Sequence, residues 1–300
     1  MRTTVYLMRR NIKLFFKDKG MFFTSLITPA ILLVLYATFL SNVYKDSFMS
    51  SVPSALQIDA KLIDGLVGGQ LMSSLLAVSC ITVAFCSNFL MVQDKANGTF
   101  KDLNMSPVKP SSLAISYYAA SLFSTLIICY VATALCFIYI AFIGWYLSFA
   151  DVMLLLFDVL LITLFGTALS SVVNFFLNTQ GQISAVGSIV SSCYGFICGA
   201  YMPISSFGSG LQKIIAFLPG TYATSLVRNH SMQGVLLEME NQGIPTELTN
   251  GFRDAVDCNI YFFDKQVDVP VMFAILCLTI AALVGAYVML NVYKKTAKSS

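Results

Sequence analysis

Six apolar runs dominate the sequence, and each is long enough, or nearly so, to cross a lipid bilayer as a helix. A helix needs about 20 apolar residues to span the hydrocarbon core. The runs cover residues 21–40, 69–93, 113–143, 152–176, 184–201 and 271–291, and Asp158 is the only charged residue inside them. Of the 300 residues, 57% are hydrophobic and 11% are charged, against roughly a quarter charged in soluble domains. The sequence therefore predicts an all-α polytopic membrane protein, with 1–300 as a single transmembrane domain.

The segments that connect the runs fall into two groups of opposite charge. Segments 1–20, 94–112, 177–183 and 292–300 hold twelve Lys and Arg residues against three acids. Segments 41–68, 144–151 and 202–270 hold six bases against eleven acids. Because Lys and Arg accumulate on the cytoplasmic side, the first group is expected in the cytoplasm with both termini. The formal net charge of +3 is too small to indicate a nucleic-acid partner.

Residues 2–19 contain no glycine or proline, and their apolar and basic residues fall on opposite sides when they are placed at helical spacing. Apolar side chains such as Val5, Ile12 and Phe15 fall on one face and the bases on the opposite flank. This pattern predicts an amphipathic helix that lies in the inner headgroup layer and contacts membrane lipid; a simple basic anchor for the first span is the alternative. The candidate residues of this interfacial helix are Arg9, Arg10, Lys13, Lys17 and Asp18.

The long outer segment, 202–270, begins with two amphipathic stretches that Pro219 and Gly220 separate. Residues 203–230 are too polar to span the bilayer. This pattern predicts a re-entrant helical hairpin in the outer leaflet before the last span, and a helix bound at the outer surface is the alternative. Residues 231–268 are acidic and polar, which predicts a small outer cap.

The loop after the second run carries definite start and stop signals. Asn97-Gly98 is a turn pair, and Thr99 and Asp102 have capping-box spacing. Pro107 prevents a helix from continuing far beyond it. These signals predict a cytoplasmic helix of about two turns with Thr99 as its N-cap, whereas a plain connector would need no such signals.

Several short motifs recur in a fixed order along the chain. The loop reads acid-base-x-x-Gly-Thr-x-x-x-Leu-x-x-x-Pro at Asp94, Lys95, Gly98, Thr99, Leu103 and Pro107. Arg9-Arg10-Asn11 precedes Lys17-Asp18-Lys19, and Gly199-Ala200-Tyr201-Met202-Pro203 precedes Leu218-Pro219-Gly220-Thr221-Tyr222. In this order and placement, the chain resembles the permease subunits of the ABC type-2 exporters over essentially its whole length.

The resemblance implies a permease in the cell (cytoplasmic) membrane that works as a homodimer or heterodimer with two separate ABC ATPase subunits. In that family the loop helix is a coupling helix, which sits in a cleft of the ATPase. The expected residues for ATPase coupling are Asp94, Lys95, Gly98, Thr99, Asp102, Leu103 and Pro107. Transport would be outward, by ATP-driven alternating access, of a lipophilic drug, peptide or lipid-linked cargo.

The chain has no residues for hydrolysing ATP by itself. No glycine directly precedes a lysine, so the phosphate-binding Gly-x4-Gly-Lys-Ser/Thr loop is missing from the sequence. We therefore expect no cofactor in this chain and no enzymatic activity of it alone, with ATP and Mg²⁺ on the partner ATPase. An ion-coupled secondary transporter and a non-transporting assembly or sensor subunit are the alternative functions.

Polar side chains inside the runs indicate either helix packing or a conduit. Candidates on the second run are Ser74, Thr82, Phe85 and Asn88, and those on the fifth are Ser184, Ser188 and Ser191. In the resembling family these two spans flank the transport pathway, although close packing of helices explains the serines more simply. Asp158 would either hydrogen-bond a neighbouring Ser or Tyr or bind a proton or a cationic cargo.

Overall fold

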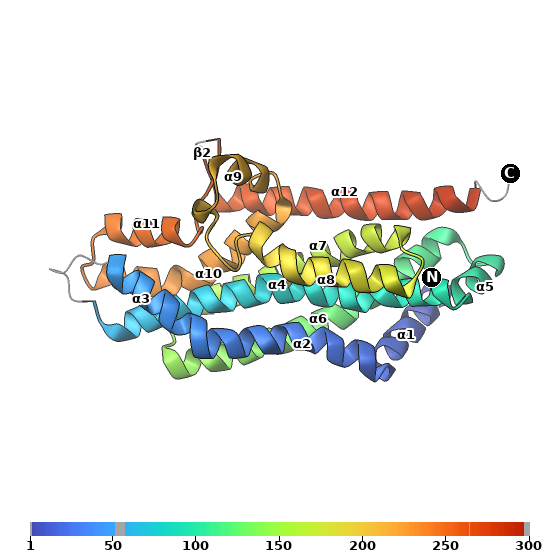
Figure 1. Ribbon diagram of the computed structural model, residues 1–300, viewed down its shortest axis with the longest axis horizontal. Coiled ribbons are helices and arrows are strands. Elements are labelled where there is room, and N and C mark those ends of the chain that lie inside the picture. The colour runs from blue at the N-terminus through green and yellow to red at the C-terminus, as the bar shows by residue number, and fades with distance from the viewer. Residues whose placement is uncertain (1, 52–57, 264, 297–300) are drawn as a thin grey trace.

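The computed structural model describes residues 2–51, 58–263 and 265–296, and its elements form an elongated helical bundle (Figure 1). The first half contains α1 (Arg2–Lys17), α2 (Lys19–Leu35), the π-helical turn η1 (Tyr36–Leu40), α3 (Ser41–Ser51), α4 (Ala60–Ala96), α5 (Thr99–Met105) and α6 (Pro110–Ile143). The second half contains α7 (Phe149–Phe176), α8 (Gln180–Ile197), the 3-10 turn η2 (Ile204–Ser206), α9 (Ser209–Ile215), α10 (Pro219–Asn241), α11 (Thr246–Ala255), β1 (Ile260–Phe262), β2 (Lys265–Val267) and α12 (Val269–Thr296).

In the described part of the chain, five helical segments are long and apolar enough to cross a membrane: Lys19–Met49, Ala60–Ala96, Pro110–Ile143, Phe149–Phe176 and Val269–Tyr293. They contain the runs predicted at 21–40, 69–93, 113–143, 152–176 and 271–291. The run predicted at 184–201 corresponds to α8, which ends at Ile197 and is not one of the five. Its glutamines, glycines and serines make it less apolar than the others. Residues 297–300 of the predicted cytoplasmic tail lie outside the described part of the chain.

The first two spans extend further than the sequence predicts. The first continues through η1 into α3, and the second begins at Ala60 instead of residue 69. The Asp59 carboxylate caps α4 by accepting a hydrogen bond from the Lys61 amide at 3.0 Å. Asp64 then pairs with Lys45 of α3 at 2.7 Å. The cap on α4 and this ion pair between α3 and α4 help to explain why the polar residues of α3 and of the start of α4, outside the apolar runs, are also helical.

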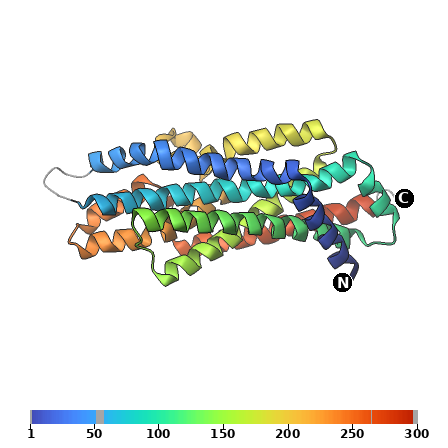
Figure 2. The same cartoon turned by 90° about the horizontal axis from the view of Figure 1, so that it is seen from below.

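Helix α4 forms the axis of the bundle, as both views show (Figures 1 and 2). It contacts α2, α6, α7, α8 and α10, and almost all of its side chains are buried. Gly69 allows α10 to approach α4 closely, because a Cβ there would lie 2.8 Å from the Ser231 carbonyl. Helix α12 covers α7 and α10, and α1 packs against α6. Any movement of α4 is therefore shared with most of the bundle.

The two ends of the bundle carry different elements (Figure 1). Helices α1 and α5 and the C-terminal end of α12 lie at one end, which we call the α5 end. The opposite end carries α3, α11 and the C-terminal half of α10, and we call it the α11 end. The first described helix, α1, and the end of the last, α12, thus lie at the same end of the bundle.

The segment between α8 and α12 differs from the predicted arrangement of two short helical stretches over 203–230. The two helices do separate before Pro219, but α10 continues past His230 to Asn241. Nearly every residue from Gly220 to Met232 is buried, because α10 packs against α4, α7 and α12. The expected outer cap contains α11 and a short two-stranded antiparallel hairpin, β1–β2, and the fold is otherwise all-α, as predicted.

Candidate functional site

Asp94, at the C-terminal end of α4, ties three helices together. Its carboxylate accepts two hydrogen bonds from the Arg10 guanidinium of α1, at 2.6 and 3.2 Å. The Tyr117 hydroxyl of α6 donates a third, at 2.6 Å. The Asp94 side chain is 9% exposed, and its hydrogen bond raises the pKa of the Arg10 guanidinium above the ordinary value. This two-pronged geometry is the strong form of an Arg–carboxylate contact, so α1, α4 and α6 are held in a fixed relation here.

Lys95 binds the end of a fourth helix. Its ammonium group donates hydrogen bonds to the carbonyls of Asn174, Phe175 and Leu177, at 2.9, 2.6 and 2.9 Å. Asn174 and Phe175 belong to the last turn of α7 and Leu177 is its C-cap, so Lys95 lies at the negative dipole end of this helix. The ammonium also lies 5.9 Å from the Phe100 ring centroid and 5.5 Å from that of Phe175. Neighbouring residues of one motif therefore connect α4 to α1 and α6 on one side and to α7 on the other.

Helix α5 follows directly after this pair of residues. Its N-cap is Gly98, with a left-handed φ of 82°, and no side chain caps it. The predicted capping box is therefore wrong: Thr99 is the first helical residue and does not bond the Asp102 amide. The left-handed turn at Gly98 starts the helix one residue earlier than predicted. The exposed Asp102 carboxylate lies in the first turn, where its negative charge interacts favourably with the helix dipole.

The two faces of α5 have different roles. Phe100 and Leu103 pack against a buried cluster at the α5 end that includes Met91, Tyr117 and Tyr287. Lys101, Asp102 and Met105 point outward, and Met105 is 71% exposed. Sequence reasoning selected Leu103, which faces the protein's own interior, and missed Met105. Met105 is therefore the apolar side chain that α5 leaves on its outward face.

The remaining predicted residues of this region are on the surface of the α5 end. Arg9, Lys13, Lys17 and Pro107 are exposed, while Asn11 and Phe15 are buried where α1 packs against α6. Asp18 lies between α1 and α2 and caps α2 by accepting a hydrogen bond from the Met21 amide at 3.1 Å. This contact lies within the chain and fixes the start of α2.

The predicted pathway residues of α4 lie in the packed interior. Ser74, Thr82, Phe85 and Asn88 are each at most 3% exposed. The Asn88 amide donates hydrogen bonds to Ser170 and Ser171 of α7, at 3.0 and 2.7 Å. Because α4 is surrounded by helices of its own chain, these residues join helices and do not face an open channel in this structure. The pathway role expected of these four residues stays a prediction.

A groove between α2 and α8, with α4 at its floor, does contain the serines predicted on the fifth run. Ser184, Ser188 and Ser191 line it together with Thr24 and Thr28 of α2. Asp18 and Gln93 lie at its α5 end, and its volume is about 750 Å³. The Ser184 and Ser188 hydroxyls also donate to α8 carbonyls one turn earlier, which satisfies them without a ligand. The groove is large enough for a ligand of drug size.

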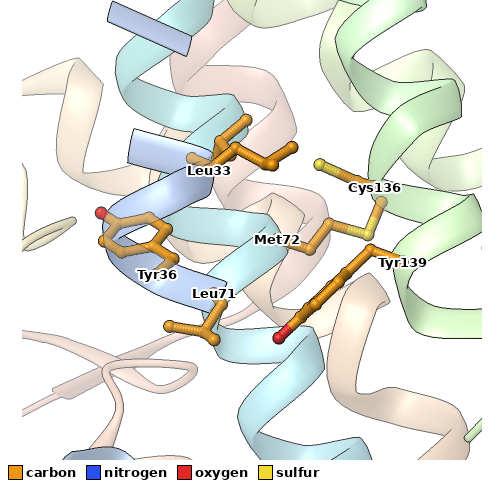
Figure 3. Close-up of a pocket in the computed structure, with 7 residues that line it drawn as sticks. Leu33, Tyr36, Leu71, Met72, Cys136 and Tyr139 are labelled. Atoms are coloured by element: carbon orange, nitrogen blue, oxygen red, sulfur yellow. The ribbon is translucent and has the colours of Figure 1, made fainter. Parts of the chain in front are cut away.

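A second crevice, beside the π-helical turn, is apolar and small. Leu33, Tyr36, Leu71, Met72, Leu75, Cys136 and Tyr139 line it, and Figure 3 shows it between α2, α4 and α6. Its volume of about 20 Å³ is close to that of one water molecule. It is therefore a packing defect next to η1 and has no room for cargo.

Asp158 of α7 has a partner that the sequence analysis did not foresee. Its carboxylate contacts the imidazole of His230 on α10. The prediction of a neighbouring Ser or Tyr as the partner is wrong, because α10 extends further into the bundle than expected and brings His230 against α7. Among the residues that the structure describes, no cluster of three or more His, Cys, Asp or Glu could hold a metal ion.

Comparison with known proteins gives one informative match. A sequence model of the ABC-2 type transporter family matches residues 2–230, which cover α1 to the middle of α10. A search of curated proteins found no match to the chain.

Proposed function

The chain belongs to the ABC-2 type transporter family and is a multi-pass membrane permease, and from this premise we propose that it exports a lipophilic cargo, driven by separate ATPase subunits. The family match over residues 2–230 is the observation that carries the proposal. ABC transporters couple the hydrolysis of ATP to conformational change, and this permease has no phosphate-binding loop of its own. ATP and Mg²⁺ would therefore bind to the partner.

The contacts at the α5 end support a coupling role for α5. The helix is short, begins at a fixed left-handed turn, and packs through Phe100 and Leu103. Asp94 and Lys95 connect its base to α1, α6 and α7. A force applied to the exposed side of α5 by a docked ATPase would therefore move these helices together with α4, since their contacts are charge-assisted and largely removed from water.

The arrangement of the helices also supports a six-span topology in which α8 is a span as well, the fifth along the chain. Helix α7 ends and α8 begins at the α5 end, and α8 runs back along α4. Six passes then leave α1 and the end of α12 on the same side, as Figure 1 has them. The excess of Lys and Arg on segments at this end makes it the cytoplasmic side, and the α11 end the outer side. The cell membrane is the expected location.

The groove between α2 and α8 is the best candidate for the cargo pathway. Hydroxyl groups from both helices line it, together with apolar side chains such as Ile27 and Phe89. Among its described lining residues, Asp18 carries the one formal charge, at the α5 end. Such a lining suits a neutral or weakly cationic amphiphile that enters from the inner leaflet. A second permease copy, identical or homologous, would close the open side of the groove.

The rival functions have less support. The ion-coupled transporter would require Asp158 to be available for an ion, but its carboxylate contacts His230. The family membership also favours an ATP-driven transporter over a sensor or assembly subunit.

Purification through a tag on this chain tests the proposal. We expect a vanadate-sensitive ATPase to co-elute from native membranes with the wild-type chain. Met105→Asp should reduce the co-eluting activity at least tenfold, because a charge would enter the exposed apolar contact of α5. Met49→Asp places the same charge on an exposed methionine of α3 at the α11 end and should have no effect. Absence of any co-eluting ATPase, or equal activity in both variants, would contradict the proposal.

A further inference from the structure

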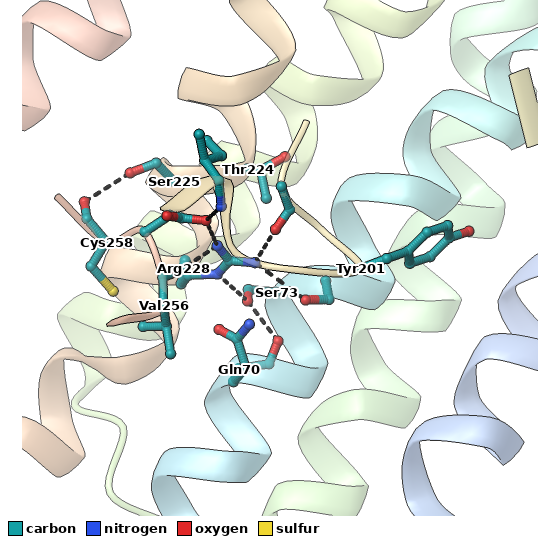
Figure 4. Close-up of polar contacts among 12 residues, drawn as sticks. Gln70, Ser73, Tyr201, Thr224, Ser225, Arg228, Val256 and Cys258 are labelled. Carbon is teal, nitrogen blue, oxygen red and sulfur yellow. Dashed lines mark hydrogen bonds and ion pairs between the residues drawn. The ribbon is translucent and has the colours of Figure 1, made fainter. Parts of the chain in front are cut away.

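Arg228 of α10 is the largest of the fully buried side chains, with 1% of its surface exposed. Figure 4 shows its guanidinium at the meeting point of several segments. It donates hydrogen bonds to the carbonyls of Val256 and Gly199, the latter at 2.9 Å. The Ser73 and Ser74 hydroxyls of α4 lie 3.5 and 3.4 Å from it. A buried guanidinium is costly unless its donors are satisfied, so an arginine in this place requires a structural or functional reason.

The partners of Arg228 belong to parts of the chain that are far apart in sequence. Gly199 lies in the connector that follows α8, Val256 follows α11, and the two serines belong to the central helix α4. One side chain of α10 thus joins the α11-side end of α8 to the bundle axis and to the outer cap. Removing it would leave several buried acceptors without a donor.

Asp257 completes this cluster and adopts a left-handed backbone conformation, which is uncommon for residues other than glycine. Its φ is 57°, in the left-handed region, and its side chain is 8% exposed. The carboxylate accepts a hydrogen bond from the Ile204 amide at 2.7 Å and lies 3.6 Å from Nη1 of Arg228. Gly199 opposite is also left-handed, with a φ of 70°, and a Cβ there would lie 3.2 Å from the Asp257 carboxylate. Non-glycine residues in this region are strained and persist where the surroundings hold them.

A cavity borders the same cluster. It has a volume of about 570 Å³, and Asp257, Ile204, Lys213 and Tyr261 are among its lining residues. The connector between α8 and α9 therefore has free space beside it on the side of the outer cap. The contacts of Arg228 and Asp257 hold the connector against α4 although the neighbouring space would allow it to move.

We infer that Arg228 and Asp257 form an outer latch, which fastens the α11-side end of α8 to α4 and the cap while the transporter is closed to the outside. This inference rests on the proposed export function. A cargo in the groove between α2 and α8 must leave past the end of α8, so that end has to separate from α4. The separation breaks the contacts of Arg228 with Gly199 and releases the amide of Ile204 from Asp257. Arg228 is a positioning residue in this account and does not contact the cargo.

Native cysteines on both sides of the latch allow a direct test. Cys198 and Cys258 adjoin Gly199 and Asp257 and are 3% and 1% exposed, and Cys80, in the middle of α4, is 0% exposed. Labelling of each thiol by a polar maleimide is measured by mass spectrometry, on the complete complex in lipid nanodiscs. We expect Arg228→Lys to speed the labelling of Cys198 at least tenfold while Cys80 stays protected. Arg253→Lys is the matched control, because Arg253 of α11 donates to Gln233 and does not contact the connector.

The wild-type complex supplies a second measurement that needs no variant. Labelling of Cys198 should rise severalfold during ATP turnover and return to the resting rate when hydrolysis stops. Unchanged Cys198 labelling during turnover, with ATP being hydrolysed, would overturn the latch, as would unchanged labelling in a folded Arg228→Lys complex. Labelling of Cys80 together with Cys198 would show that the variant is unfolded. The latch is then tested by the labelling of Cys198 in the wild-type complex during ATP turnover. If no ATP is hydrolysed, the proposed function fails, and the resting comparison of variants still decides on the latch.

Discussion

The carboxylate oxygen Oδ2 of Asp158 on α7 lies 2.6 Å from Nδ1 of His230 on α10. His230 is the single histidine of the chain, and the Asp158 side chain is 0% exposed. The second carboxylate oxygen, Oδ1, is buried without a hydrogen-bond partner. The pair therefore joins α7 to α10 at a place where neither an isolated carboxylate nor an isolated imidazolium would be stable.

Removal of the two partners should have unequal effects. His230→Leu leaves the carboxylate buried with no partner and should lower the free energy of unfolding by about 3 kcal/mol. Asp158→Asn keeps a neutral hydrogen-bonding group beside the imidazole and should cost about 1 kcal/mol. Thermal unfolding of the detergent-solubilised protein measures both. The double variant Asp158→Leu/His230→Leu should be more stable than His230→Leu alone; a double variant that is less stable would show that the pair is not the source of the effect.

Gly98 should tolerate few other residues, because its φ is 82°. A Cβ there would meet no neighbouring atom within 4 Å, so only the backbone conformation opposes substitution. Gly98→Ala should destabilise α5 by about 1 kcal/mol, and Gly98→Asn by less, since asparagine accepts the left-handed region. Hydrogen exchange of residues 99–105 should accelerate about fivefold in the alanine variant.

The control for Gly98 is Gly251, which lies within α11, also has open space around it, and has no left-handed φ. Gly251→Ala should leave the hydrogen exchange of α5 unchanged, and it should leave that of α11 unchanged or slow it. Faster exchange of α5 in both variants, or in neither, would refute the role assigned to the turn.

Asp257 should make the stability of the outer cap depend on pH. Burial raises the pKa of its carboxyl to about 6, against the opposing effects of Arg228 and the Ile204 amide. Because the folded protein then binds this proton more tightly than the unfolded chain does, the cost of the buried charge is present above pH 6 and disappears towards pH 4. The other charged groups around the same cavity are Lys213 of α9 and Asp254 of α11.

Asp257→Asn removes that charge and should raise the unfolding temperature at pH 8 but not near pH 4. The upper limit of the gain in free energy of unfolding is about 3 kcal/mol, from a shift of roughly two pKa units. Asp254→Asn is the control, since Asp254 is exposed on the same cap. Equal unfolding temperatures of wild type and Asp257→Asn across this pH range would contradict the cost assigned to the buried carboxylate.

Single cysteines at the two ends of the bundle report the orientation. Lys101 of α5 and Glu247 of α11 are both exposed and lie at opposite ends. In intact cells an impermeant thiol reagent should label Glu247→Cys, and it should label Lys101→Cys only after the membrane is permeabilised. Labelling of both positions from outside would rule out the six-span topology with α5 in the cytoplasm.

The features that could be predicted from the sequence are those with a local cause. Long apolar runs place five spans, and Asn97-Gly98 with Pro107 places α5. The predicted N-cap was wrong by one residue, because Gly98 itself adopts the left-handed conformation that ends one helix and starts the next. Helix α8 is harder to classify from composition, since its serines and glycines resemble both a packing face and a polar lining.

Contacts between distant segments could not be predicted, because no periodicity along the chain encodes them. Arg228 and His230 fall in a polar stretch that reads as an outer segment, yet α10 buries both. Asn88 looks like a pathway residue on one face of α4, but its side chain is buried and bonds Ser170 and Ser171 of α7. Met105 carries no sequence signal beyond its place near the end of α5; its exposure follows from the orientation that Phe100 and Leu103 impose.

A photo-crosslinking residue at position 105 tests the central claim most directly, because it asks what α5 touches in the membrane of living cells. From position 105 we expect a crosslinked product that contains a soluble protein with a Gly-x4-Gly-Lys-Ser/Thr loop. From position 103, whose side chain faces inward, we expect only crosslinks within the chain. If no such ATPase is captured from position 105, or if position 103 captures it equally well, α5 is not the docking element and the coupling account is wrong.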